Sequence, residues 1–279
     1  MLRSDDVTPR AYKQVDVFTA TPLPMRDDSS GYQIRHGQGY TTFLHDSHGL
    51  HLELTIFVAQ SDPVKISRLT IENRSNRPRR LSVTAYLEWV LGASREVSAP
   101  HVTTEVDPVT GAMIARNRWS EEFAQIVSFA DLVVQWGAGK GQRLTGDRTE
   151  FIGRLGHPSA PVGLEPGSVL SGRVGAGLDP CAALQTTIEL GIGARSEVAV
   201  ILGSCDNLTE AQRLIGAYRN ADIGATFEGV KRGWAETLDI VQVSTPDRAF
   251  DIMLNRWLPY QTLSSRVLGR TGFSSTPAA

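Results

Sequence analysis

The chain has 279 residues, of which 41% are hydrophobic and 21% are charged, and it contains 26 glycines and 14 prolines. This composition is typical of a folded globular protein and excludes an intrinsically disordered or fibrous chain. Lys and Arg together number 28 against 30 for Asp and Glu, so the net charge of −2 leaves no basic excess for a nucleic acid or an anionic membrane.

The cysteines and the N-terminal residues bear on the compartment. Cys181 and Cys205 are too few for a disulfide scaffold and lie in apolar segments, which predicts buried free thiols. The first six residues carry charges where a signal peptide has an apolar run. No stretch approaches the roughly 18 apolar residues of a membrane span. We therefore expect a cytoplasmic protein without direct membrane insertion.

Alternation of apolar and polar residues predicts β-strands in the first 205 residues. Residues 50–58, 64–71 and 81–90 alternate with a period of two, the pattern of a strand with one buried face. Strands followed by turns at this spacing indicate a large antiparallel sandwich. Further strands are expected at residues 112–116, 125–130, 132–136, 183–190 and 197–203.

Turn and loop signals separate these strands. The sequence Asp107-Pro-Val-Thr-Gly111 predicts a hairpin, because proline and glycine occupy turn positions. Many glycines and prolines between Gly137 and Pro180 predict a long excursion rich in loops, with short strands inside it. Loops of this length in compact domains usually serve a function or pack over another part of the protein.

Helical spacing replaces the alternation after residue 205. Residues 207–219 place apolar side chains at intervals of three and four, with Asn207 or Thr209 as the N-cap. A second helix is predicted over residues 222–238 from the same spacing.

The last segment is expected to begin another unit. Residues 241–243 are predicted as a short strand, and Thr245-Pro246 opens a third helix with proline in the first helical position. Pro259 should kink or interrupt that helix. We expect three parts: a β domain at residues 1–205, a helical linker at 206–240 and the start of a helical barrel at 241–279.

Known catalytic and metal-binding motifs do not occur. No phosphate-binding loop, nucleophile elbow or HExxH helix is present in the sequence. His45, His48 and His51 are three residues apart, but a strand points His48 away from the other two, and a turn interrupts the segment. We therefore expect no metal site.

Residues 21–43 combine Pro, Gly, Arg, His and Tyr more densely than an ordinary strand. Gly37 and Gly39 permit a bulge or a close approach of the backbone. Tyr32 and Tyr40 are flat amphipathic side chains suited to stacking on sugar rings. A structural hydrogen-bond network at a sheet edge explains the same residues, so both interpretations stay open.

Four separated motifs resemble glycoside hydrolase family 94, formerly grouped as glycosyltransferase family 36. They are Thr21-Pro-Leu-Pro, Arg35-His-Gly-Gln-Gly-Tyr40, Leu69-Thr-Ile-Glu-Asn-Arg-Ser75, and Asn255-Arg-Trp-Leu-Pro-Tyr-Gln261 with Arg270-Thr-Gly-Phe273. The segment from Ser94 to Glu105 is most similar to the cyclic β-1,2-glucan synthase branch. The resemblance covers nearly the whole chain in order.

The resemblance implies a mainly β fold: a large antiparallel β-supersandwich, linker helices and the first helix of an incomplete (α/α)6 barrel. The implied reaction is inverting phosphorolysis of a β-glucosidic bond, in which a carboxylic acid protonates the leaving oxygen and inorganic phosphate attacks as co-substrate. The family's general acid and phosphate-binding residues lie beyond the last motif. We therefore expect no catalytic residue, no cofactor, and a fragment cut at both ends that is inactive alone.

The resemblance also supplies substrate-binding candidates. In the family, loops of the sandwich domain reach toward the sugar site. In phosphorylase dimers they reach the sugar site of the partner subunit. The loop at residues 92–105 contributes Arg95, His101 and Glu105, and Arg270 is the candidate at the rim of the site. Arg95 and Glu105 can also be surface charges, and Arg270 a cation at a helix end. Three tryptophans are expected in the core: Trp89, Trp234 and Trp257.

Three functions follow from these observations. The first is the sandwich part of a glycoside phosphorylase or glucan synthase acting on β-glucan oligosaccharides, in a family whose full-length synthases are inner-membrane proteins with this region in the cytoplasm. The alternatives are a free-standing carbohydrate-binding module and an oligomerisation module, because the helices after residue 207 have apolar faces. Expected partners are the glucan, a second copy of the chain or a missing barrel domain, and no nucleic acid.

Overall fold

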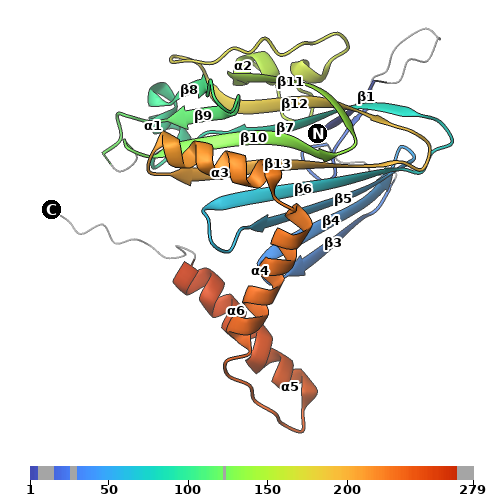
Figure 1. Cartoon of the computed structure of the whole chain (residues 1–279), viewed down its shortest axis with the longest axis vertical. Coiled ribbons are helices and arrows are strands. Elements are labelled where there is room, and N and C mark those ends of the chain that lie inside the picture. Colours follow the sequence, from blue (N-terminus) through green and yellow to red (C-terminus); the bar gives the residue numbers. More distant parts are fainter. Residues whose placement is uncertain (6–15, 26–29, 122–123, 269–279) are drawn as a thin grey trace.

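A computed structural model describes residues 1–5, 16–25, 30–121 and 124–268 (Figure 1). Its strands form two antiparallel sheets, with eight strands in the order β3-β4-β5-β6-β13-β10-β9-β8 and five in the order β11-β12-β7-β1-β2. The predicted mainly β sandwich followed by helices is confirmed. No helix in these ranges is long and apolar enough to cross a membrane.

The strands of the larger sheet are β3 (Tyr32–Gly37), β4 (Tyr40–Ser47), β5 (Leu50–Val58), β6 (Val64–Asn73), β8 (Thr103–Val106), β9 (Met113–Arg116), β10 (Val127–Trp136) and β13 (Arg195–Cys205). Those of the smaller sheet are β1 (Leu2–Ser4), β2 (Val17–Phe18), β7 (Arg79–Glu88), β11 (Ala138–Asp147) and β12 (Pro180–Leu190). Short helical turns lie in the loops: α1 (Arg95–Ser98), η1 (Ala99–His101), α2 (Arg148–Phe151) and η2 (Val162–Leu164). The later helices are α3 (Leu208–Asn220), α4 (Ile223–Leu238), α5 (Arg248–Ile252), η3 (Met253–Trp257), α6 (Leu258–Thr262) and η4 (Leu263–Leu268).

Two strand predictions needed correction. The segments at residues 125–130 and 132–136 form one strand, β10, because Asp131 between them continues the ladder opposite Ile201 of β13. The excursion after Gly137 contains the ten-residue strand β11, paired with β12. Glycine disfavours strands, but a Cβ on Gly139 would lie 2.6 Å from the Val134 side chain, so this close packing requires glycine.

The central strands of the larger sheet are buried on both faces. One face packs against the smaller sheet through a cluster that includes Leu52, Ile71 and Leu132. The opposite face is covered by α3, where Phe129 of β10 packs in one cluster with Leu214. Figure 1 shows α3 lying along β10 and β13. Burying each such side chain is worth about 1.5–3 kcal/mol, so both layers stabilise the central strands.

A buried ion pair fixes α3 on the sheet. The Asp131 carboxylate is fully buried, and the Arg219 guanidinium donates to both of its oxygens at 2.7 and 2.9 Å. Two parallel charge-assisted bonds fix both distance and orientation. Arg219 lies in the last turn of α3, so the pair sets the register of the helix on β10.

The helix caps follow the sequence in part. Asn207 caps α3 by accepting from the Glu210 N–H at 2.9 Å, which confirms one of the two predicted caps. Asp222 caps α4 by accepting from the Ala225 N–H at 3.0 Å. The third helix is capped by Asp247, so Pro246 lies before the helix instead of in its first position.

The segment after α4 differs from prediction in two ways. Residues 241–243 do not form a strand, and the Val241 side chain is 71% exposed. Pro259 does not end the third helix, which continues from residue 248 to 268. Its wider π-helical turns at Met253–Trp257 and Leu263–Leu268 accommodate a proline that lacks an N–H and crowds the preceding turn. We call residues 248–268 the C-terminal helix.

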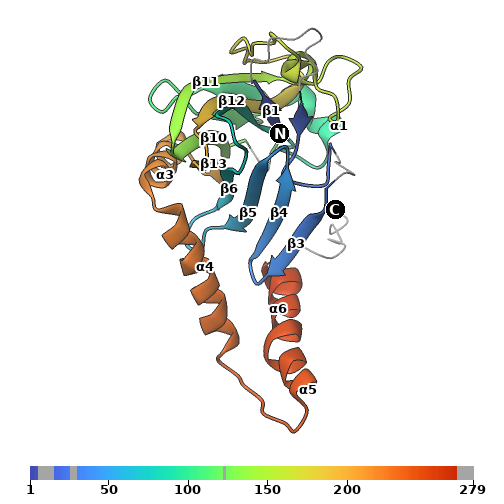
Figure 2. The same cartoon turned by 90° about the vertical axis from the view of Figure 1, so that its right-hand side faces the viewer.

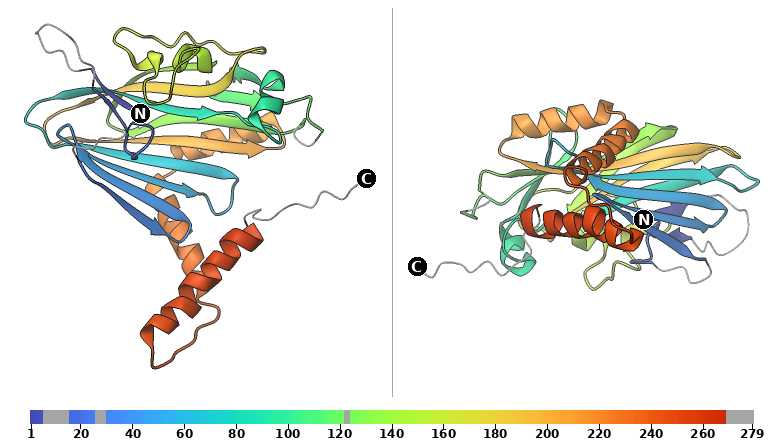
Figure 3. Two further views of the ribbon diagram at one scale, coloured as in Figure 1. Left: turned by 180° about the vertical axis from the view of Figure 1, so that it is seen from behind. Right: turned by 90° about the horizontal axis from the view of Figure 1, so that it is seen from below.

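The β3–β4 turn holds this helix against the sheet. Gly39 at the tip has φ +80°, and its N–H donates to the Tyr260 hydroxyl at 3.0 Å. The Trp234 ring of α4 meets the Tyr260 ring edge to face at 4.8 Å. The tip of the hairpin therefore lies between α4 and the C-terminal helix (Figure 2). These two helices project from the sandwich below β3 (Figure 3).

Both cysteines are free, as predicted. Cys181 is fully buried, and burial raises the pKa of its thiol. Cys205 is only partly buried, which corrects the expectation for that residue.

Replacing Asp131 with alanine should destabilise the protein by about 3 kcal/mol, because it leaves the Arg219 guanidinium without its buried partner. Urea unfolding measures the change. Arg213→Ala on the exposed side of the same helix breaks only surface ion pairs and should cost less than about 1 kcal/mol. Equal losses in the two variants would contradict the assigned role of the pair.

Replacing Gly39 with alanine should release the C-terminal helix from the sandwich. A Cβ at this position would lie 2.2 Å from Trp234 Nε1, in addition to a left-handed backbone. Hydrogen exchange in residues 248–262 should accelerate strongly while the strands stay protected. Gly167→Ala is the matched control: its φ is +82° and its Cβ meets nothing within 4 Å, so it reports backbone strain of about 1–2 kcal/mol alone. Similar hydrogen-exchange rates of the C-terminal helix in both variants would rule out this role of the β3–β4 turn.

Candidate functional site

The predicted substrate-binding residues belong to the excursion between β7 and β9, at the β8 edge of the larger sheet. Arg95 begins α1, His101 ends η1 and Glu105 lies in β8. Arg270 falls outside the described residues. Three of the four candidates therefore lie on one continuous stretch of chain, and each has its own set of partners.

Arg95 belongs to an ion-pair cluster. Its Nε lies 3.1 Å from a Glu88 carboxylate oxygen, and its guanidinium also pairs with Asp179. Arg148 joins the same two carboxylates, with its Nε 2.9 Å from Glu88. Two cations and two anions thus neutralise one another and tie α1 to β7 and to the start of β12. The structure gives Arg95 a structural role, and its contact with a substrate stays a prediction.

The same cluster sets the charge of Glu88. Burial raises the pKa of this carboxyl group, but hydrogen bonds from Tyr86 and Arg148 and the charge of Arg95 outweigh it, so the pKa is lowered overall. A carboxylate held in its ionised form is unsuited to protonate a leaving oxygen near neutral pH. Other described carboxyl groups whose pKa is lowered are Glu72, Glu96, Asp107 and Glu210.

His101 stacks on an exposed tryptophan. The His101 and Trp119 rings lie 4.1 Å apart with an angle of 12° between their planes. Trp119 is 69% exposed, so most of the indole faces solvent. The stacked pair joins the excursion to the loop after β9 and presents the flat indole ring, and we call it the His101–Trp119 platform.

A buried asparagine holds the platform in place. Asn117 is 2% exposed, and its side-chain amide donates to the Leu91 carbonyl at 2.7 Å. Its side-chain oxygen accepts from the backbone N–H groups of Trp119 and Ser120 at 3.2 and 3.3 Å. This turn anchors the Trp119 loop to the residues that follow β7. Sequence analysis did not single out Trp119; the signal was an Asn two residues before a tryptophan flanked by polar residues.

Glu105 points to a different neighbour. Its carboxylate lies 3.2 Å from the Arg116 guanidinium and is 55% exposed. Arg116 lies on β9, the neighbouring strand, so the pair is a surface ion pair across the end of the sheet. Within the described residues no hydrogen bond or ion pair links Arg95, His101 and Glu105, so the structure places them in three adjacent groups and not in one cluster.

The tryptophan predictions were partly wrong. Trp89 is 4% exposed and lies in the core, as predicted. Trp234 packs against the helix-side cluster and is partly buried. Trp257 is 55% exposed, which corrects its assignment to the core. Helical spacing predicted a buried position, but the described part of the chain provides nothing that covers this face.

The two tyrosines of the dense segment around β3 pack against other residues of the same chain. Tyr32 stacks on His45 at 3.8 Å, and Tyr40 packs edge-on against Phe227 at 4.9 Å. Both tyrosine rings thus have protein partners, and the structural network accounts for them. Metal-ligand types are also dispersed: the described residues contain no group of three or more that could hold a metal ion.

Comparison with known proteins supplies the family. The model of the glycosyl hydrolase 94 supersandwich domain matches residues 10–221. The chain is 36% identical over 263 residues to the cyclic beta-(1,2)-glucan synthase NdvB of Rhizobium meliloti (strain 1021), covering 94% of this chain and 9% of that protein. It is 25% identical over 256 residues to the N,N'-diacetylchitobiose phosphorylase of Vibrio furnissii, covering 89% of this chain and 31% of that protein.

A solved bacterial glucoamylase complexed with acarbose aligns with a TM-score of 0.49 and 9% identity, over 76% of this chain and 29% of that one. The chain thus spans less than a third of the length of these proteins. The family model nevertheless covers most of the chain, and the relatives match nearly all of it. The protein therefore belongs to glycosyl hydrolase family 94 and contains its supersandwich domain.

Proposed function

We propose that this chain is the substrate-contacting sandwich part of a family 94 protein that acts on β-1,2-glucans. The glucan class comes from the relative with 36% identity, which is named a cyclic beta-(1,2)-glucan synthase. The phosphorylases among the relatives support the coarser assignment to the chemistry of glycosidic bonds. Association with a second copy or a separate barrel domain stays a prediction.

The observation that carries the proposal is the His101–Trp119 platform. A pyranose ring has an apolar face of C–H groups that packs on a flat aromatic surface, and the indole of Trp119 is open to solvent. His101 supports the indole from the other side, so little conformational freedom is lost on binding. The neighbouring Glu105 and Arg116 offer polar atoms to sugar hydroxyls.

We propose that cleavage of the glucan needs a general acid that the residues around the platform do not supply. Inverting phosphorolysis needs a protonated carboxylic acid at the leaving oxygen, and inorganic phosphate as co-substrate. Glu88 at the end of β7 and Glu105 in β8 are both paired with arginines. The chain therefore binds the glucan without breaking its bonds and needs no resident cofactor.

Titration calorimetry with β-1,2-glucooligosaccharides tests the binding. Trp119→Ala should weaken the affinity of the chain about tenfold, because the removed indole provides the stacking surface. Trp136→Ala is the matched control, since Trp136 is 45% exposed at the end of β10, away from the platform. Equal losses in both variants, or no heat at millimolar ligand, would remove the platform from the proposal.

A second measurement tests the absence of cleavage. The chain incubated with the same oligosaccharides and inorganic phosphate should release no glucose 1-phosphate above a protein-free blank. Sustained release that scales with protein concentration would show that these residues include a working general acid and would overturn this part of the proposal.

A further inference from the structure

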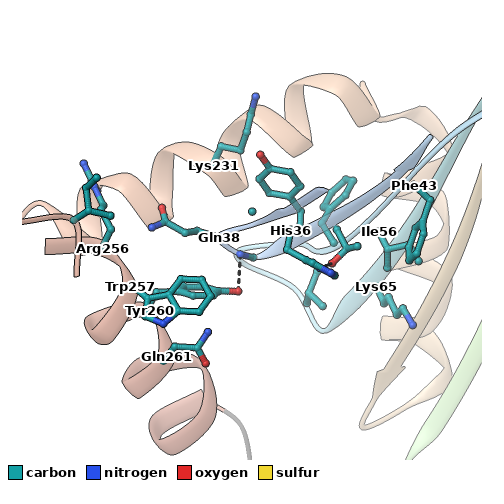
Figure 4. Close-up of a pocket in the computed structure, with 17 residues that line it drawn as sticks. His36, Gln38, Phe43, Ile56, Lys65, Lys231, Arg256, Trp257, Tyr260 and Gln261 are labelled. Carbon is teal, nitrogen blue, oxygen red and sulfur yellow. Dashed lines mark hydrogen bonds between the residues drawn. The ribbon is translucent and has the colours of Figure 1, made fainter. Parts of the chain in front are cut away.

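A cavity lies at the opposite edge of the larger sheet from the His101–Trp119 platform. It has a volume of about 1000 Å³ and opens between the β3–β4 hairpin, α4 and the C-terminal helix (Figure 4). The strand order puts β3 at one edge of the sheet and β8 at the other, so the two sites are separated by the full width of the sheet. We call this cavity the hairpin–helix pocket.

Three structural elements supply different chemistry to the pocket. The C-terminal helix contributes Trp257 and Tyr260, whose rings lie together on one wall in Figure 4. Strands β4 and β5 contribute an apolar floor that includes Phe43 and Ile56. The volume is that of a small-molecule site, and its lining combines apolar surface with a few polar groups, as such sites usually do.

The charged side chains around the pocket are all cationic. Lys65, Lys231 and Arg256 line it together with His36, and no Asp or Glu does so among the described residues. Lys231 pairs with Glu228 and Arg256 with Asp239, each at 2.6 Å. The Lys65 side chain has no hydrogen-bond or ion-pair partner within the described part of the chain. In a protein of net charge −2, this concentration of cations favours an anionic ligand.

The aromatic and amide groups specify the rest of the ligand. Trp257 is 55% exposed and offers a flat face for the apolar side of a sugar ring. The Tyr260 hydroxyl accepts from the Gly39 N–H, which leaves its own proton free to donate to a ligand oxygen. Gln38 and Gln261 add amide donors and acceptors suited to hydroxyl groups.

We propose that the hairpin–helix pocket binds a saccharide that carries a negatively charged group, either a phosphate ester or a carboxylate. The sugar ring stacks on Trp257, and the cations of the lining together attract its anionic group. This site goes beyond the proposed function, because it uses other residues at another edge and takes a charged instead of a neutral sugar.

Titration calorimetry of the whole chain separates the possible ligands. The probes are glucose 6-phosphate, glucuronate, glucose and inorganic phosphate. At least one of the two charged sugars should bind about tenfold more tightly than glucose and than phosphate, and the tighter of the two identifies the anionic group. Added salt should weaken this binding, because it screens the cations.

Variants assign the binding to this pocket. Trp257→Ala should weaken the charged sugar about fivefold or more, and Lys65→Gln should weaken it by a smaller factor, because it removes one of the three attracting charges. Arg143→Ala removes an exposed cation from β11 and is the control for net charge; it should leave the affinity unchanged. Trp119→Ala should also leave it unchanged, which keeps this result distinct from failure of the glucan-binding proposal. Unchanged thermal unfolding temperatures would show that the variants are folded.

Four results would overturn the proposal. Glucose binding as tightly as the charged sugars would remove the role of charge. Inorganic phosphate binding as tightly would remove the role of the sugar ring. Full affinity in Trp257→Ala would place the ligand elsewhere. No heat from either charged sugar at millimolar concentration would show that the pocket does not bind this class of ligand.

Discussion

Burial of the central strands of the larger sheet on both faces is the constraint on which the rest of the structure depends. The smaller sheet covers one face of the central strands and α3 covers the other, so the outer strands of the larger sheet remain available. Edge strands have unpaired backbone groups and are usually protected by loops or helices. Here the excursion through α1 and η1 runs beside the β8 edge. The β3–β4 hairpin lies at the other edge, between α4 and the C-terminal helix. The two candidate sites lie towards these edges, where the outer strands of the larger sheet are less completely covered than the central ones.

Polar residues inside this closed structure hold its parts in register. Asp131 fixes α3 through its ion pair with Arg219. Glu197 of β13 is 3% exposed and forms an ion pair with Arg68 of the neighbouring strand β6. Asn73 is fully buried and donates to three backbone carbonyls at the end of the sandwich. A buried polar group without a partner would cost more than its bond contributes, so each of these residues specifies one arrangement of its neighbours.

The two candidate sites differ in how the chain prepares them. The His101–Trp119 platform rests on a turn fixed by Asn117 and presents an exposed indole ring, which we propose for a neutral sugar chain. The hairpin–helix pocket is concave, cationic and dependent on Gly39, which alone lets the turn approach Trp234 closely. A protein with both sites would hold a neutral glucan at one edge and a charged sugar at the other. A change at Gly39 should therefore affect only the hairpin–helix pocket.

The sequence by itself determined the fold class, the family and most elements, because alternation, helical spacing and cap residues act over short distances. Leu50–Val58 is a strand as its alternation predicts, and Asn207 caps α3. Tertiary structure decided the rest. It made a strand of the glycine-rich β11, left Trp257 exposed and placed His101 on Trp119. Each of these depends on contacts between segments far apart in the chain, and local patterns contain no information on which distant surfaces will meet.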